Sequence, residues 1–291
     1  MAREVMRNSS GVYDCYMGHR AQARRDARNL EARRRPRLKD PRIRAYVRAK
    51  LRQHWSPEII AGRLKLDHPG LTISPEAIYQ FIYEPSNPRR AEDIACLRRG
   101  HRRRRRRKIG RKERRTKIPH RVPIDVRPAV VAARTEFGHW EGDTLISRKS
   151  RAARQSLSER RSRLVLLTKL ARKGAVEMKH AVLKRFQPWP KAARQSLTLD
   201  NGTENVRHEE ITAALGTACY FCHPYAAWER GSNEQINGLV RWYLPKGTDL
   251  GMITDEQLQW IEDRLNNRPR KCLGFKTPFE VASRALVALQ G

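Results

Sequence analysis

Residues Trp228–Lys246 read WERGSNEQINGLVRWYLPK, a pattern that predicts a helix with a chemical face and a packing face. The glycine and Ser232 form a plausible helix start, with Ser232 as the N-cap, and the proline near the end closes the segment. Glu234 and Arg241 are two turns apart, so their side chains share one face with Asn237 between them. The apolar residues fall mostly on the other side: Ile236, Leu239, Val240 and Tyr243.

Two further acids stand in or at the end of β-like runs. Asp143 lies in FGHWEGDTLI, residues 137–146, and Asp200 follows SLTL, residues 196–199. Three carboxylates that converge from two strands and a helix would repel each other without a counter-ion. A pair of divalent metal ions resolves that repulsion and performs phosphoryl transfer. The sequence therefore predicts a metal site formed by Asp143, Asp200 and Glu234.

Several motifs in this order resemble a known family. They are GHWEGD at 138–143, DNG at 200–202, WERGSNE at 228–234 followed by NGL at 237–239, PKGTD at 245–249 and NNRPRK at 266–271. Together they resemble the DDE transposases of insertion-sequence family thirty. The 33 residues between Asp200 and Glu234 match the spacing in that family. The resemblance covers nearly the whole chain.

The resemblance implies a ribonuclease-H-like, integrase-type catalytic core. Asp143, Asp200 and Glu234 would be both the catalytic carboxylates and the ligands of two Mg²⁺ (or Mn²⁺) ions. The implied reaction is DNA cleavage at the inverted-repeat ends of an insertion sequence, followed by strand transfer into target DNA. Double-stranded DNA is then the partner. A homo-oligomer on DNA is also expected, because the two ends must be paired.

The residues alone leave a rival for each acid. Glu141 is two positions from Asp143 and points to the same side of a strand, so it can be a supporting group or a salt-bridge partner while the family motif selects Asp143. Asp200–Gly202 is also a generic turn sequence, although the run before it places it at a strand end, where α/β sites lie. Glu229 precedes the glycine and is expected to pair with an arginine, which favours Glu234 as the ligand.

Three residues around the predicted helix are expected to bind DNA. Arg241 and Asn237 would contact the backbone beside the scissile phosphate, because arginine is a good bidentate ligand for phosphate. Lys246, in the PKGTD motif, is predicted with them. A solvated polar helix face is the alternative interpretation of Asn237 and Arg241.

The charge of the chain predicts a polyanionic partner. Lysine and arginine total 62 against 30 acids, a formal charge of +32, which is typical of nucleic-acid binding. Twelve of the sixteen residues from Arg102 to Lys117 are basic. We expect this run to be a disordered linker that orders on phosphate, with binding that weakens as salt rises. Its six consecutive arginines are predicted DNA-binding residues: Arg102, Arg103, Arg104, Arg105, Arg106 and Arg107.

The N-terminal part of the chain is predicted to be helical. Residues 1–54 are basic and helix-forming, and Ser56-Pro57-Glu58 and Ser74-Pro75-Glu76 each combine an N-cap, a first-turn proline and an acid at the positive helix end. Two short helices joined by the break at Asp67–Gly70 indicate a helix-turn-helix near 55–83. A helical hairpin fits the pattern as well, and the family resemblance favours the helix-turn-helix. Asp40-Pro41 begins a helix before them.

The pattern changes at about Arg127. Strands are expected at 137–147, 156–170, 195–200 and 217–222, and helices at 176–186, 207–215, 255–267 and 278–289. This order predicts an α/β domain with a mixed sheet. The domains are then a helical DNA-binding region at 1–95, a basic linker at 96–126 and the integrase-like catalytic domain at 127–291.

Other features bound the setting of the protein. The sequence has no run of 18 apolar residues and no signal-peptide core, so we expect no membrane span and a cytoplasmic, nucleoid-associated protein. The five cysteines are expected to be reduced, with Cys219 and Cys222 as buried strand residues rather than metal ligands.

Residues 3–8 resemble the end of the first helix-turn-helix of the family, most of which is absent from this sequence. The alternative function is therefore a truncated, catalytically impaired DNA-binding remnant or regulator. A basic RNA-binding protein would not need three spaced carboxylates. A metal-dependent nuclease would cut DNA without joining it.

Overall fold

The computed structural model describes residues 17–34, 38–97, 118–224, 226, 229 and 231–289, without the side chains of residues 31–34, 232 and 234. The arginine run 102–107 and the N-terminal motif 3–8 lie outside the described residues. The expectations for those two segments therefore remain predictions.

A five-stranded mixed sheet forms the centre of the larger part of the chain. Its strands are β1 His139–Ile146, β2 Ala153–Glu159, β3 Val165–Leu170, β4 Ser196–Leu199 and β5 Ala218–Phe221. They lie in the order β3-β2-β1-β4-β5, with β2 antiparallel to β1 and β3, and with β4 and β5 parallel to β1. This is the strand order of the ribonuclease-H-like fold, so the predicted fold class is confirmed.

The run expected as a strand at 156–170 is two strands, and that prediction is wrong in its boundaries. Residues 160–164 reverse the chain, and Arg163 adopts a left-handed backbone conformation with φ 63°. The Glu159 carboxylate accepts from the Ser162 N–H and Oγ–H at 2.5 and 2.7 Å. A polar side chain thus closes a tight hairpin that hydrophobic periodicity alone does not reveal.

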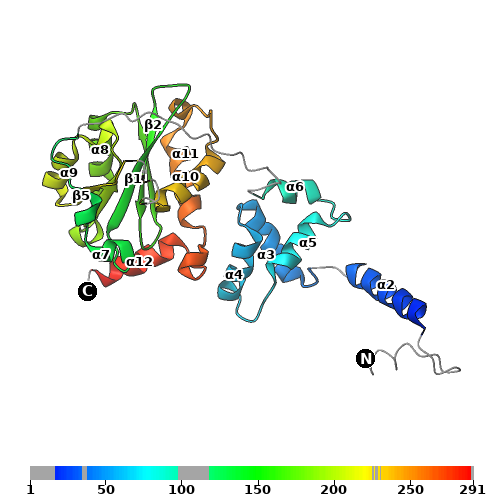
Figure 1. The fold of residues 1–291 in the computed structure, drawn as a ribbon. Coiled ribbons are helices and arrows are strands. Elements are labelled where there is room, and N and C mark those ends of the chain that lie inside the picture. The colour runs from blue at the N-terminus through cyan, green and yellow to red at the C-terminus, as the bar shows by residue number, and fades with distance from the viewer. Residues whose placement is uncertain are drawn as a thin grey trace.

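Helices cover both faces of the sheet (Figure 1). On one face, α8 Ala175–Phe186 and α9 His208–Leu215 pack on a core that includes Trp140, Leu157 and Leu197. On the other face, α10 Gly231–Tyr243 and α11 Asp255–Asn266 pack on Val165 and Leu167. Further described elements of this domain are α7 Ala129–Ala133, α12 Pro278–Ala288, and the 3-10 turns Ile124–Val126, Lys191–Ala193, Thr203–Asn205, Leu250–Met252 and Lys271–Leu273.

Helix α10 begins at Gly231, so Ser232 lies in its first turn and the predicted N-cap is wrong. A carboxylate from the sheet satisfies this end of the helix instead. The backbone N–H of Asn233 donates to Oε2 of Glu141 at 3.1 Å. A negative charge at this position also complements the positive end of the helix dipole.

The N-terminal part is helical, as predicted, and has its own core. Its helices are α2 Gly18–Arg34, α3 Pro41–Arg52, α4 Pro57–Asp67, α5 Pro75–Tyr83 and α6 Arg90–Ala95. Asp40 and Ser74 cap α3 and α5 through their side chains, as the sequence predicts. Helices α4 and α5 pack against each other across residues 68–74, the arrangement that a helix-turn-helix requires. Helix α2 runs apart from this bundle (Figure 1).

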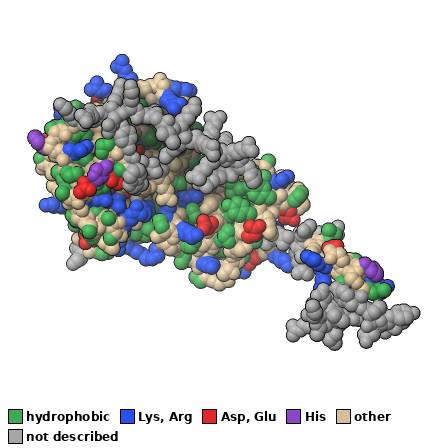
Figure 2. Space-filling view, viewed as in Figure 1, with side chains coloured by type: hydrophobic (Ala, Val, Ile, Leu, Met, Phe, Trp, Pro, Cys, Tyr) green, Lys and Arg blue, Asp and Glu red, His purple; other side chains and the backbone are tan. Residues whose placement is uncertain are grey.

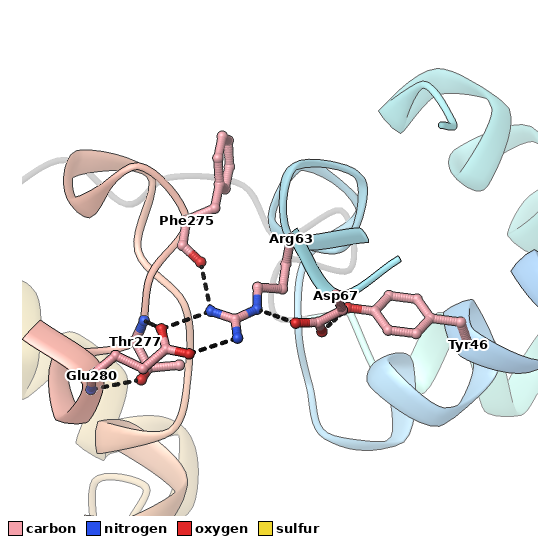
Figure 3. A network of polar contacts seen from close by, with 6 residues as sticks. All are labelled: Tyr46, Arg63, Asp67, Phe275, Thr277 and Glu280. Atoms are coloured by element: carbon pink, nitrogen blue, oxygen red, sulfur yellow. Dashed lines mark hydrogen bonds and ion pairs between the residues drawn. The ribbon is translucent and has the colours of Figure 1, made fainter. Parts of the chain in front are cut away.

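Residues from the two parts meet at Arg63 of α4 (Figure 3). Its guanidinium donates to both carboxylate oxygens of Glu280 at 2.8 and 2.7 Å and to the carbonyl of Phe275 at 3.2 Å. Asp67 accepts from Arg63 Nε at 2.7 Å and from the Tyr46 hydroxyl at 2.7 Å. One arginine therefore links the helical region to the start of α12.

Further contacts support the same junction. The buried Arg268 donates to the carbonyl of His54 at 2.5 Å. Gly62 faces the ring of Phe275 so closely that a β-carbon there would clash with it. On the C-terminal side of the undescribed segment, Ile118 belongs to the core of the sheet domain and Phe221 N–H donates to the carbonyl of Val122 at 2.9 Å. The predicted domain boundaries remain predictions, because residues 98–117 are not described.

Among the described residues, no helix has both the length and the apolar character needed to cross a bilayer.

Candidate active site

Asp143 and Asp200 lie at the same height on neighbouring parallel strands. The β1–β4 ladder pairs Glu141 with Thr198, and the same register continued by two residues sets Asp143 level with Asp200. Neighbouring strands are about 4.8 Å apart, and alternate residues of a strand point to one face. The two carboxylates, predicted from separate motifs, therefore point to the same face of the sheet. That is the face against which α10 packs, because Asn237 of α10 contacts Asp143.

Neighbouring amides hold each of these carboxylates. Asn237 Nδ2 donates to Oδ2 of Asp143. Oδ1 of Asp200 accepts from the backbone N–H of Gly202 at 3.1 Å and from Nδ2 of the buried Asn205 at 2.8 Å. Asp200 is thus both the first residue of a turn and the residue directly after β4, so the two interpretations of its motif are compatible. Both acids remain partly exposed, as a site open to a ligand requires.

The backbone of Glu234 lies in α10, one turn before Asn237. Residues three apart on a helix are neighbours on its surface. Position 234 therefore lies on the same side of α10 as Asn237, which is the side that faces Asp143. The side chain of Glu234 is outside the described residues. Its predicted role as the third ligand therefore remains a prediction.

Glu141, the rival of Asp143, is fully buried in an ion pair with Arg160. One carboxylate oxygen accepts from Arg160 Nη1, and the other accepts from the Asn233 N–H. Arg160 also donates through Nε to the carbonyl of Val131 at 2.9 Å. Burial lowers the pKa of Arg160, and the charge of Glu141 opposes that shift. The salt-bridge prediction for Glu141 is confirmed, and the residue anchors the start of α10 to β1.

Glu229, the rival of Glu234, has a histidine as its partner among the described residues. Its carboxylate accepts from His223 Nδ1 at 2.8 Å and from the His223 N–H at 2.9 Å, where an arginine was expected. Asp125 lies 3.0 Å from the other ring nitrogen. The hydrogen bond to Glu229 and the charge of Asp125 raise the pKa of His223.

The predicted DNA-binding residues divide into two groups. Asn237 faces Asp143, whereas Arg241 and Lys246 are exposed at and beyond the C-terminal end of α10. The face drawn in Figure 2 has a broad area of lysine and arginine on the lower part of the sheet domain.

Sequence reasoning missed Asn205 and Arg154. The strand expected at 156–170 begins after Arg154, whereas β2 begins at Ala153.

Cys219 and Cys222 are buried and not disulfide-bonded, as predicted. Burial raises the pKa of the Cys219 thiol to about 11, so it stays protonated at neutral pH. Within the described side chains, no three His, Cys, Asp or Glu groups come together as a metal cluster. Glu234 is not among those side chains.

The donor chemistry of the site fits a magnesium-type ion. Asp143 and Asp200 supply hard carboxylate oxygens, which Mg²⁺ and Mn²⁺ prefer to sulfur or imidazole ligands. Mg²⁺ is commonly bound through one or two carboxylates together with substrate phosphates. Two partly exposed carboxylates on one face of a sheet meet that requirement.

Known proteins of similar sequence are transposases. The chain is 43% identical over 244 residues to the transposase for insertion sequence element IS1086 of Cupriavidus metallidurans, covering 82% of this chain and 72% of that protein. It is 40% identical over 294 residues to transposase InsI of element IS30A from Escherichia coli, covering 98% and 76%. It is 37% identical over 278 residues to the transposase of element IS4351 from Bacteroides fragilis, covering 96% and 84%.

No family model matches the chain. Among solved structures, the catalytic core domain of BIV integrase aligns with a TM-score of 0.43 at 21% identity, covering 53% of this chain and 99% of that one. The sequence relatives are similar over most of their length and carry one shared description. The chain therefore belongs to the IS30 family of insertion-sequence transposases.

Proposed function

We propose that this chain cuts DNA at the inverted-repeat ends of an insertion sequence and joins the freed ends to target DNA. Asp143, Asp200 and Glu234 would be its catalytic carboxylates. The observation that carries the proposal is the common height of Asp143 and Asp200 on one face of the sheet, against the side of α10 that contains position 234. The relatives are described as transposases of insertion sequence elements, which supports the same reaction.

Asp143 and Asp200 would hold Mg²⁺ or Mn²⁺, with Glu234 completing a site for two ions. Such ions supply activation of the attacking oxygen and stabilisation of the departing one in an in-line displacement at phosphorus. Contacts within the chain would hold these ligands in place before DNA arrives. Asn205 orients Asp200, and the buried Glu141–Arg160 pair fixes the helix that carries Glu234.

The excess of positive charge would hold the DNA. Asn237 contacts Asp143, and Arg241 and Lys246 lie at and beyond the C-terminal end of the same helix, where they would contact the DNA backbone. The run Arg102–Arg107 would add contacts to phosphates farther away. The paired helices α4 and α5 supply a helix-turn-helix candidate for contact with the element end. Two ends must be brought together, so we infer a homo-oligomer on DNA, working in the cytoplasm at the nucleoid.

Cleavage of a labelled duplex that carries the terminal repeat of the element tests this function. We expect Mg²⁺-dependent nicking at the repeat end by the wild type and its loss in Asp200→Asn, which should still bind DNA. Asp263→Asn, at an exposed position on α11, is the matched control and should cut normally. Equal cutting by Asp200→Asn would contradict the metal-site assignment.

The products separate the rival functions. Joined products in the presence of target DNA indicate strand transfer, whereas cut products alone indicate a nuclease. Salt-sensitive binding with no cutting by the wild type or by Asp200→Asn would favour a DNA-binding remnant or regulator.

A further inference from the structure

Arg154, on β2, is a buried arginine that lacks a hydrogen-bond partner within the described part of the chain. It is 2% exposed, and none of its three guanidinium nitrogens has a hydrogen-bond acceptor among the described residues. Burial lowers its pKa to about 9, and the charge of Asp143 opposes that shift while Arg241 reinforces it. An unpaired buried charge is among the costliest arrangements in a folded protein.

Other buried arginines of the same domain are paired. Arg160 donates to Glu141 and to the carbonyl of Val131, and Arg270 donates to the carbonyl of Leu265 at 3.1 Å. The fold therefore supplies acceptors where an arginine has a structural role. The described residues supply no such acceptor to Arg154, which leaves its guanidinium available to a ligand from outside the fold.

A pocket of about 170 Å³ adjoins this side chain. Four cationic residues line it, Arg148, Arg154, Arg241 and Lys246, together with Thr248, Gly247 and apolar residues of β1 and α10. Among the described residues, none of these four cations is in an ion pair with a carboxylate. The volume is several times the roughly 30 Å³ that a water molecule occupies in the liquid, so a tetrahedral anion fits.

The pocket adjoins the candidate active site. On β2, Ser156 pairs with Asp143, and Arg154 is two residues from Ser156 on the same face. On α10, Arg241 is one turn beyond Asn237, which contacts Asp143. A DNA strand with its reacting phosphate at Asp143 would place a neighbouring phosphate near the pocket.

We propose that this pocket binds one backbone phosphate of the DNA strand held at Asp143, with Arg154 as its buried ligand. The proposal rests on the proposed function. A planar guanidinium can bind two phosphate oxygens at once. The interaction between guanidinium and phosphate is stronger in a site shielded from water. The exposed side chains of Arg148 and Arg241 can change rotamer to admit the phosphate and close over it.

The first arm of the test measures DNA affinity against salt in the absence of divalent metal. Arg154→Met should bind about tenfold more weakly, and the slope of log affinity against log salt should become shallower by about 0.9, the loss of one phosphate contact. Lys184→Met removes the same charge from an exposed position on α8, across the sheet, and should keep the wild-type slope. An unchanged slope in Arg154→Met would overturn the proposal.

The second arm measures the melting temperature in inorganic phosphate against chloride at constant ionic strength. Phosphate should stabilise the wild type and Lys184→Met more than Arg154→Met, whose melting temperature in chloride should be no lower than that of the wild type because an unpaired charge is gone. If Arg154→Met does not fold, Arg154→Lys takes its place, because lysine keeps the charge but cannot make two parallel hydrogen bonds to phosphate. Phosphate should then raise the melting temperature of Arg154→Lys less than that of the wild type.

The two arms separate the sources of phosphate. A phosphate effect that depends on Arg154, with no change in the DNA slope, would mean a free-anion site and would overturn the DNA assignment. If phosphate stabilises the wild type and both methionine variants equally, the anion binds elsewhere, and the proposal for this pocket is overturned as well. Failure of the pocket leaves Mg²⁺-dependent cutting by the wild type intact, whereas failure of the proposed function appears as no cutting at all.

Discussion

Replacing Glu141 by glutamine should destabilise the fold, whereas replacing Asp143 by asparagine should leave its stability nearly unchanged. The two acids are two residues apart on β1 and face the same side of the sheet. Glu141 is 0% exposed and paired with Arg160, which is 4% exposed. Asp143 is partly exposed and is held by the amide of Asn237.

The magnitude follows from burial. Removing one partner of a buried ion pair costs about 3–5 kcal/mol, because the other charge stays buried and unpaired. Glutamine keeps one acceptor oxygen, so we expect the lower end, about 3 kcal/mol. For a domain of this size that corresponds to a fall in melting temperature of about 6–12 °C. For Asp143→Asn we expect a change in the free energy of unfolding below about 1 kcal/mol, because the side chain keeps its size and is partly solvated.

Thermal denaturation followed by circular dichroism measures the stability, and Mg²⁺-dependent nicking of the element end measures the chemistry. Glu141→Gln should still cut DNA at a temperature well below its own melting point, and Asp143→Asn should not. The double variant Glu141→Gln/Arg160→Met should recover part of the lost stability, because it removes the unpaired charge. Wild-type melting of Glu141→Gln would refute the buried pair. If Asp143→Asn cuts DNA and folded Glu141→Gln does not, Glu141 would be the catalytic acid and Asp143 would not.

Three further predictions concern the junction and the basic run. Arg63→Met should lower the free energy of unfolding by about 1 kcal/mol, a small value because Glu280 is 38% exposed. Urea denaturation would measure this change, and an unchanged midpoint would mean that the Arg63–Glu280 contact does not stabilise the protein. The hydrogen bond from Arg63 holds the pKa of Glu280 at about 2, below its usual 4.5, so this contact should stabilise fully above about pH 4.5 and be lost as the pH falls towards 2. Denaturation curves of the wild type and Arg63→Met across that range should therefore converge at low pH, and a constant difference would contradict the assignment. Replacing Arg102–Arg107 by serine should flatten the salt dependence of DNA binding, whereas an unchanged slope would mean that this run does not contact phosphate.

Local chemistry made several elements predictable. Asp40 and Ser74 cap helices that start where their motifs place them, because a cap bonds to backbone groups two or three residues away. Asp200 directly follows a strand because three apolar or β-prone residues, Leu197, Thr198 and Leu199, precede a turn sequence. The family motifs then connected acids far apart in the chain, and the sheet register sets two of them side by side.

Contacts between distant segments were beyond the sequence pattern. The hairpin at 160–164 depends on Glu159 closing its own turn, and the start of α10 depends on Glu141, 92 residues before Asn233. Arg63 and Glu280 are 217 residues apart. No periodicity within a helix or strand predicts such pairs, because they form only when the chain has folded.

The sequence alone determined the class of fold, the order of the acids along the chain and the negative charge expected of the partner. Periodicity, spacing and net charge are all properties of the linear chain. The tertiary structure decided which acid is buried with a counter-ion and which stays partly open beside a second carboxylate. It also decided that Arg154 finds no acceptor among the described residues. The reason is physical: burial and pairing depend on which segments exclude water from one another, so two acids only two positions apart on one strand, Glu141 and Asp143, have opposite surroundings.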